Sequence, residues 1–184
     1  SLFIASLVVL AWQPYTLFER KRFLKKAAEK RKKLKGLKVV GITGSYGKTS
    51  TKEFLAHILG KKFVVLKTPE HKNSEMGIAH TILYDLTDEH EVFVCEMGAY
   101  SRGGIKLLAD MVQPTTGIVT GVNEQHLGVF GSGMNLFSAE GGGELVQSLS
   151  QESALILNDD SRQLHELGPW LQLWNPNFAR YLWC

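Results

Sequence analysis

A glycine-rich segment that follows a short apolar run most constrains how this chain can fold. It reads Gly-Ile-Thr-Gly-Ser-Tyr-Gly-Lys-Thr-Ser-Thr-Lys over residues 41–52, directly after Leu-Lys-Val-Val at 37–40. This order predicts a buried strand, a phosphate-binding turn and a helix that begins near Lys48. Glycines let backbone N–H groups close around phosphate oxygens, and the helix N-terminus adds partial positive charge. The segment therefore predicts a site for a nucleoside triphosphate.

The side chains of this turn suit different parts of a magnesium–nucleotide complex. Lys48 can reach the β- and γ-phosphates, and the hydroxyl of Thr49 suits Mg²⁺ as a ligand. The strict P-loop pattern has glycine where this chain has Ile42, so the segment is the Thr-Gly-Ser-x-Gly-Lys-Thr variant. An ordinary turn is the alternative, which the strand, loop and helix order disfavours. The nucleotide-binding candidates are Thr43, Gly44, Ser45, Tyr46, Gly47, Lys48, Thr49 and Ser50.

Short apolar runs alternate with helical stretches along the rest of the chain. The runs are at residues 63–66, 92–95, 117–120 and 154–157. The helical stretches lie near residues 48–59, 75–86, 103–111 and 134–149. Such alternation predicts an α/β fold, a parallel sheet with helices on both faces. Because ligands of these sheets bind beyond the carboxyl ends of strands, we expect the chemistry at residues 44–49, 96–98 and 123–126.

Two polar side chains follow the expected strands at that edge. Glu96 ends the run at 92–95, and His126 follows the run at 117–120 by six residues. A carboxylate and an imidazole near a triphosphate could hold Mg²⁺ directly or through water. Taken singly, Glu96 could cap a turn and His126 could be an ordinary loop histidine. Their place at consecutive strand ends beside the P-loop favours the functional interpretation.

The charge is unevenly distributed. The net charge is +3, yet residues 19–36 carry ten Lys or Arg against two Glu, so the remainder is mildly acidic. Residues 1–18 are hydrophobic and include Trp12 and Tyr15, which is typical of a membrane segment with its basic flank on the cytoplasmic side. As a helix, residues 2–18 would span about 25 Å, short of the ~30 Å hydrocarbon core. A soluble helix packed on the domain, followed by a charged linker, is the alternative.

The basic segment 19–36 is expected to be a juxtamembrane helix or a linker. As a helix it would lay Phe23, Ala27 and Leu34 against anionic headgroups. Nucleic acid is the other partner of basic runs, but no aromatic or base-reading pattern accompanies this one, so we expect none. The two cysteines predict neither a disulfide framework nor a metal site. We therefore expect a cytoplasmic domain that the N-terminal segment anchors to the cytoplasmic face of the membrane.

Taken together, these motifs resemble the Mur ligase family, the ATP-dependent amide-forming enzymes of cell-wall precursor synthesis. The resemblance covers about residues 37–160 and extends beyond the P-loop. Residues 68–78 resemble the family's Asn-containing segment, residues 123–132 its Asn-x-x-x-His-Leu block, and residues 158–160 the usual end of the next strand. Glu-Met-Gly-Ala at 96–99, followed by Gly-Gly-Ile at 103–105, resembles the D-alanyl-D-alanine-adding branch in particular.

The resemblance implies a fold, a reaction and roles for named residues. The fold would be the family's P-loop-containing central domain. ATP would phosphorylate a substrate carboxylate, and an amine would attack the acyl phosphate; the substrates would be a UDP-muramoyl peptide and D-alanyl-D-alanine. Lys48 would neutralise the transferred phosphate, and Asn73 would orient the phosphate end. Thr49 and Glu96 would hold a first Mg²⁺, and His126 a second.

The chain also departs from the family pattern. A lysine usually follows the His-Leu block, but residues 136–145 contain none, and Glu140 is the candidate substitute. Three glycines at 141–143 would weaken a helix by about 1 kcal/mol each. Residues 1–36 stand in place of the family's UDP-sugar domain. We expect an incomplete ATP-binding domain over 37–167 and an unassigned aromatic-rich tail over 168–184.

Two alternatives to the D-alanyl-D-alanine-adding reaction remain open at this point. One is another ligase of the same superfamily, of the poly-glutamate or cyanophycin type. The other is a degenerate module that binds nucleotide without turnover. A plain P-loop kinase or transport ATPase is disfavoured, because the set of Asn73, Glu96 and His126 does not fit its usual design.

Overall fold

Six short strands form one parallel sheet in the order β2-β3-β1-β4-β5-β6. The computed structural model describes residues 2–98, 101–121, 142–150, 152–158, 160–161, 164 and 179–181. Within them the strands are β1 (Lys38–Thr43), β2 (Val65–Lys67), β3 (Val92–Glu96), β4 (Thr116–Val119), β5 (Ala154–Asn158) and β6 (Ala179–Tyr181). All neighbouring strands pair in parallel, which confirms the predicted α/β class.

The neighbouring strands β1 and β3 are buried on both faces, except for Lys38 at the start of β1, as their apolar runs predict. Ile42 of β1 lies opposite Glu96 of β3 on one side and Ile118 of β4 on the other. This register aligns the carboxyl ends of the three strands. The segments that follow them therefore meet at one edge of the sheet.

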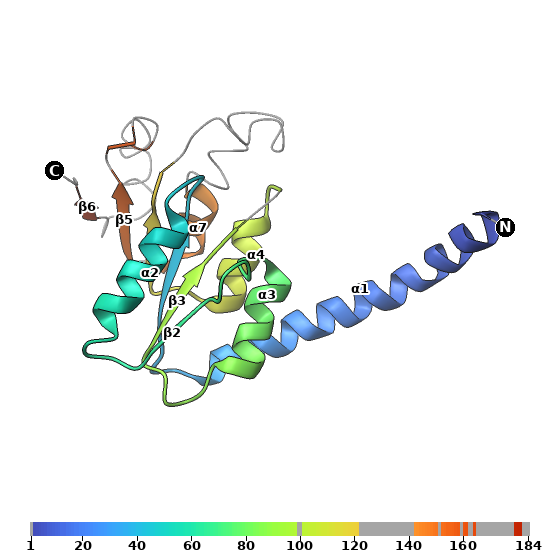
Figure 1. Cartoon of the computed structure of the whole chain (residues 1–184), viewed down its shortest axis with the longest axis horizontal. Helices are drawn as coiled ribbons and strands as arrows, with labels where there is room; N and C mark the ends of the chain where they lie inside the picture. The colour runs from blue at the N-terminus through green and yellow to red at the C-terminus, as the bar shows by residue number, and fades with distance from the viewer. Residues whose placement is uncertain are drawn as a thin grey trace.

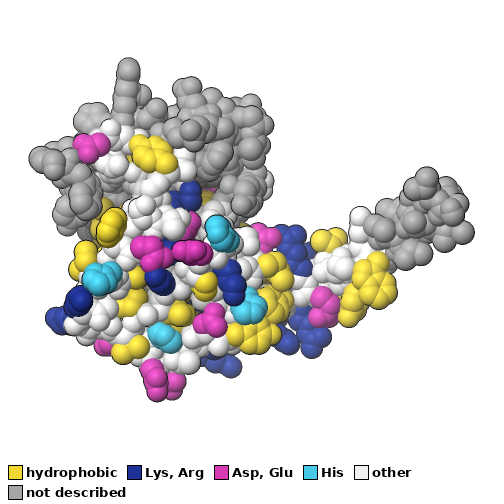
Figure 2. All heavy atoms as spheres, viewed as in Figure 1, with side chains coloured by type: hydrophobic (Ala, Val, Ile, Leu, Met, Phe, Trp, Pro, Cys, Tyr) yellow, Lys and Arg dark blue, Asp and Glu magenta, His cyan; other side chains and the backbone are white. Residues whose placement is uncertain are grey.

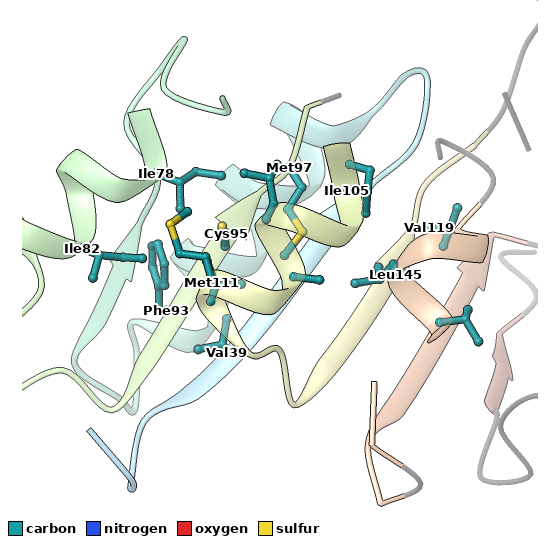
Figure 3. Packing of buried hydrophobic residues seen from close by; sticks show 14 of the residues in the cluster. Val39, Ile78, Ile82, Phe93, Cys95, Met97, Ile105, Met111, Val119 and Leu145 are labelled. Atoms are coloured by element: carbon teal, nitrogen blue, oxygen red, sulfur yellow. The ribbon is translucent and has the colours of Figure 1, made fainter. Parts of the chain in front are cut away.

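Helices cover both faces of the sheet (Figure 1). On one face α2 (Lys48–Leu59) packs on Val40, Ile42, Val92 and Val94. On the other face lie α3 (Glu75–His80), the π-helical turn η1 (Thr81–Asp85), α4 (Gly104–Val112) and α7 (Gly143–Ser148). Figure 3 shows this second core, in which Ile78, Ile82 and Met111 surround Phe93. Because side chains alternate along a strand, Val39 and Val40 belong to different cores.

Local details differ from the sequence-based expectations. β2 begins at Val65, two residues later than the apolar run, and the side chains of Phe63 and Val65 both pack against the core under α2. The helix expected over 75–86 starts as an α-helix and ends as the η1 turn. α7 begins at Gly143, directly after Gly142 with φ 89°, so this glycine precedes a helix. Residues 134–141 lie outside the described residues.

A single helix, α1 (Leu2–Lys33), covers both the hydrophobic and most of the basic N-terminal segment. Its N-terminal half projects away from the sheet, and its C-terminal half lies against α3, η1 and α4 (Figure 1). Phe23, Ala27 and Leu34 pack on the domain core, so the expectation that this stripe faces lipid headgroups was wrong. The apolar side chains of this stripe are removed from water by contact with the protein core rather than with lipid. Within the described residues, no helix combines the length and apolarity that crossing a bilayer requires.

Arg31 fastens the end of α1 to the domain. Its side chain is buried and donates hydrogen bonds to four carbonyl oxygens: Val112 at 2.8 Å, Leu34 at 3.1 Å, and Leu37 and Gln113 at 3.3 Å each. Two of these carbonyls lie at the end of α4, where helical carbonyls lack partners. Burial lowers the pKa of Arg31, but a guanidinium stays charged in proteins.

Glu144 of α7 caps the opposite end of α4. Its carboxylate is buried and accepts from the backbone N–H of Gly103 at 2.6 Å and of Lys106 at 3.0 Å. A negative charge at a helix N-terminus and a positive charge at its C-terminus both complement the helix dipole. Glu144 and Arg31 therefore hold α4 from its two ends.

Replacement of Arg31 by methionine should destabilise the chain by about 3 kcal/mol, because four carbonyls would lose a charged donor in a buried site. Urea unfolding followed by circular dichroism measures this change. Lys32→Met, at the exposed neighbouring position, should change stability by less than about 0.5 kcal/mol. Equal losses in the two variants would contradict the role of Arg31.

Candidate functional site

The carboxylate of Glu96 lies at the centre of a polar cluster at the carboxyl edge of the sheet. Glu96 ends β3 and is only 6% exposed. Its Oε1 accepts from Thr49 Oγ1 at 3.0 Å and from Asn73 Nδ2 at 3.3 Å. Its Oε2 forms an ion pair with Lys52 Nζ at 3.2 Å. The structure thus brings together three residues that the sequence singled out separately: Thr49, Asn73 and Glu96.

Three different elements position these side chains. Thr49 lies in the first turn of α2, directly after the P-loop. Asn73 lies in the segment between β2 and α3, and its carbonyl accepts from the Gly98 N–H at 2.9 Å. The side chain of Asn73 lies so close to Gly98 that a Cβ there would meet its Cγ at 3.0 Å. The backbone of Glu96 is itself held by Thr68, whose Oγ1 accepts from the Glu96 N–H at 3.0 Å.

The P-loop is pressed against the end of β4. The Ser45 N–H donates to the carbonyl of Gly121 at 2.7 Å, and Thr120 Oγ1 donates to the carbonyls of Tyr46 at 2.5 Å and of Thr43 at 3.2 Å. Gly44 has φ 136°, and a Cβ there would lie 2.4 Å from Thr120 Oγ1. Only glycine suits this position, both in conformation and in space.

Lys48 and the start of α2 place positive charge at this loop. Lys48 Nζ donates to the carbonyls of Gly44 at 2.5 Å and Ser45 at 3.3 Å. Gly47, with φ 79°, precedes the helix and carries no side chain that could cap its first N–H groups. An ammonium beside an uncapped helix N-terminus favours an anion.

Sequence reasoning missed Lys52, which is fully buried in α2. Its Nζ lies 3.2 Å from Glu96 Oε2 and 3.4 Å from Glu53 Oε1. The signal was present, because Lys52 follows Lys48 by four residues and such residues share one face of a helix. Thr43 was expected as a nucleotide contact, and its Oγ1 is buried without a hydrogen-bond partner among the described residues.

Three further candidate residues lie in a part of the chain that the structure does not describe. His126 and Asn123 fall outside the described residues, and so does Glu140. The part of the chain that the structure describes holds no group of three His, Cys, Asp or Glu side chains that could bind a metal. Cys95 is buried next to Glu96, and burial raises the pKa of its thiol well above the usual range, so it stays protonated.

The residues that are present fit a magnesium–nucleotide complex. Mg²⁺ prefers oxygen ligands and is commonly held by one or two carboxylates together with substrate phosphates. Thr49 Oγ1 and Glu96 Oε1 supply two such oxygens at the end of a glycine-rich loop. Lys48 and the N-terminus of α2 supply the complementary charge for phosphate. The arrangement can bind a polyphosphate through both a cation and backbone N–H groups.

Comparison with known proteins identifies relatives of this region. The chain matches the family model "Mur ligase middle domain" over residues 42–181. It is 41% identical over 128 residues to the UDP-N-acetylmuramoyl-tripeptide–D-alanyl-D-alanine ligase of Synechocystis sp., an alignment that covers 70% of this chain and 28% of that protein. The enzyme of the same name from Bacillus subtilis is 34% identical over 125 residues, which is 68% of this chain and 27% of that protein.

Solved structures show the same similarity in three dimensions. The MurF ligase of Thermotoga maritima, crystallised with ADP, has a TM-score of 0.76 at 29% identity and covers 89% of this chain and 36% of its own. MurF from Acinetobacter baumannii gives a TM-score of 0.75 at 27% identity, covering 89% of this chain and 34% of that one. The chain thus spans about a third of the length of these structures.

Replacement of Gly44 by alanine should destabilise the chain by about 3 kcal/mol, because the new Cβ adds a clash with Thr120 to an unfavourable φ. Gly103→Ala is the matched control, since Gly103 also has positive φ (85°) but open space around a Cβ. Its cost should be about 1 kcal/mol. Urea unfolding compares the two variants, and a larger loss at Gly103 would argue against the close contact between the P-loop and β4.

Proposed function

Because the chain belongs to the Mur ligase family, we propose that its P-loop and the Glu96 cluster form the ATP–Mg²⁺ site of a carboxylate–amine ligase. The observation that carries this proposal is the hydrogen bond between Thr49 Oγ1 and Glu96 Oε1, 3.0 Å long. It joins the first turn after the P-loop to the end of the neighbouring strand. A hydroxyl and a carboxylate at that point are suitable ligands for the metal of a bound nucleotide.

We propose that the reaction is the addition of D-alanyl-D-alanine to a UDP-muramoyl peptide through an acyl phosphate. The relatives from Synechocystis sp. and Bacillus subtilis carry the name of that activity. Their alignments cover about two thirds of this chain, and the family model spans both the P-loop and β3. Poly-glutamate and cyanophycin-type ligases are the alternative within the superfamily.

Each residue of the site has a role in this proposal. Lys48 binds and neutralises the transferred phosphate, and the backbone N–H groups at the start of α2 face the phosphate oxygens. Thr49 and Glu96 would hold Mg²⁺, which when bound neutralises charge on the phosphates. Asn73, hydrogen-bonded to Glu96, orients the phosphate end. His126 is the proposed ligand of a second Mg²⁺.

A module that binds nucleotide without turnover is the second candidate. The observation in its favour is the absence of a lysine from residues 136–145 of the sequence, where the resemblance expects one. Both candidates require a P-loop that binds nucleotide. Nucleotide binding is therefore measured first, and substrate turnover, which separates the two candidates, is measured second. Only the ligase would consume ATP in proportion to an amide product.

Lys48→Ala should abolish Mg²⁺-dependent ATP binding by the 184-residue chain, because the variant loses the ammonium that lies at the P-loop. Isothermal titration calorimetry with and without Mg²⁺ measures this binding. Lys61→Ala, an exposed lysine just beyond α2, serves as the control and should bind like the unmodified chain. If Lys48→Ala retained ATP binding, the P-loop would not be the nucleotide site.

The projecting half of α1 suggests a second property, and we propose that it contacts an anionic membrane surface from the cytoplasmic side. Trp12, Tyr15, Leu17 and Phe18 are all more than half exposed there. Figure 2 shows hydrophobic and basic side chains along this projecting arm. Aromatic residues favour the headgroup region, and each nearby Lys or Arg contributes about 1 kcal/mol of attraction to anionic lipid. The proposal is contact with the surface, not a crossing of the bilayer.

The double substitution Trp12→Ser and Phe18→Ser should weaken binding to vesicles of phosphatidylcholine and phosphatidylserine by about tenfold or more. Two aromatic side chains would then no longer enter the membrane interface. Co-sedimentation measures the bound fraction. Phe54→Ser is the control, since Phe54 is 71% exposed on α2, away from α1. Equal binding to vesicles of phosphatidylcholine alone would show that anionic lipid is not required.

A further inference from the structure

Lys52 is a buried cation that nucleotide binding by the P-loop does not by itself explain. Its side chain is 0% exposed, and among the described residues its ammonium contacts Glu53 and Glu96 as ion pairs without hydrogen-bond geometry. Removing an ammonium from water is costly, and an apolar side chain of similar volume often fills such a place with equal or better stability. Packing alone therefore gives no reason for a lysine here.

The two oxygens of Glu96 face different partners. Oε2 lies 3.2 Å from Lys52 Nζ, inside the domain. Oε1 lies 3.0 Å from Thr49 Oγ1 and 3.3 Å from Asn73 Nδ2, next to the P-loop. Lys52 therefore occupies one side of the carboxylate and leaves a single oxygen beside the Thr49 hydroxyl.

A second carboxylate keeps Lys52 in this place. Glu53 lies 3.4 Å from Lys52 Nζ and also forms an ion pair with Lys67 of β2. The hydrogen bond from Lys67 is the main reason why the pKa of Glu53 is lowered, so Glu53 is ionised at neutral pH. The ammonium of Lys52 lies between Glu53 and Glu96, whereas that of Lys48 lies at the carbonyls of the P-loop. Lys52 thus acts on the site through Glu96.

We propose that Lys52 is a positioning residue that makes Glu96 a one-oxygen ligand and so selects Mg²⁺ over Ca²⁺ at the nucleotide site. The inference rests on the proposed function, because it concerns the metal of the bound nucleotide. Mg²⁺ demands near-octahedral geometry and keeps several waters, which suits one carboxylate oxygen. Ca²⁺ accepts more ligands and often takes both oxygens of a carboxylate, one of which Lys52 blocks here.

The test compares metals rather than activities. Calorimetry measures the affinity of the 184-residue chain for adenylyl imidodiphosphate, a non-hydrolysable ATP analogue, in EDTA, in Mg²⁺ and in Ca²⁺. The unmodified chain should bind more tightly with Mg²⁺ than with Ca²⁺. Lys52→Met should lose about ten- to a hundredfold of the affinity in Mg²⁺, as is typical when a partner of a metal ligand is removed. Its affinity in Ca²⁺ should fall much less, so the preference for Mg²⁺ narrows or disappears.

Two further variants separate this role from a structural one. Lys61→Met removes an exposed lysine just beyond α2 and should leave the ratio of the two affinities unchanged. Lys52→Arg keeps the positive charge beside Glu96 Oε2 and should restore part of the Mg²⁺ preference. The inference would be overturned if Lys52→Met lost the same factor of nucleotide affinity in Mg²⁺ and in Ca²⁺, so that the ratio of the two affinities stayed unchanged.

The unmodified chain gives a test that does not depend on how any variant folds. Equal affinity in Mg²⁺ and Ca²⁺ would overturn the inference and leave the proposed nucleotide site intact. Absence of binding with either metal would overturn the proposed function, and the inference with it.

Discussion

The candidate site depends on the buried carboxylate of Glu96, whose negative charge the neighbouring elements have to neutralise. Glu96 ends β3, the strand between β2 and β1, and an unpaired carboxylate in that position would be strongly unfavourable. A hydroxyl and an ammonium from α2 and an amide from the segment after β2 converge on it. These contacts fix α2 and the Asn73 segment against the end of the strand. The candidate nucleotide site is therefore built from the groups that neutralise one buried charge.

On the face of the sheet that α4 covers, two buried charged side chains hold the helices together. Arg31 of α1 and Glu144 of α7 satisfy the two ends of α4, where backbone groups lack helical partners. Through Arg31 the N-terminal helix is joined to the face that carries α3 and α4, whereas the P-loop helix α2 covers the other face. Arg20 of α1 also forms an ion pair with Glu75 at the start of α3, so α1 approaches the segment that carries Asn73.

Local sequence was sufficient for most of the elements, although β6 lies in the tail that was left unassigned. The apolar runs of β1 and β3, the glycines of the P-loop and the position of Glu96 at a strand end each follow from neighbouring residues, and the structure places them as expected. Asn73 came from the family resemblance, and its amide does contact Glu96. Sequence reasoning missed Lys52 and misread the packing of α1. A basic helix that ends in an apolar stripe looks the same whether the stripe meets lipid or a protein core.

The sequence by itself determined the α/β class, the strand–loop–helix around Lys48 and the residue types available for a magnesium–nucleotide site, because strand periodicity, glycine conformation and side-chain chemistry are local properties. Only the tertiary structure decided which oxygen of Glu96 faces the P-loop, which cation lies behind it, and where the stripe of α1 is buried. These depend on the parallel register that aligns β1, β3 and β4 and on the docking of α1 over α3 and α4. Such contacts join residues far apart in the chain, and burial then sets the cost of each unpaired charge.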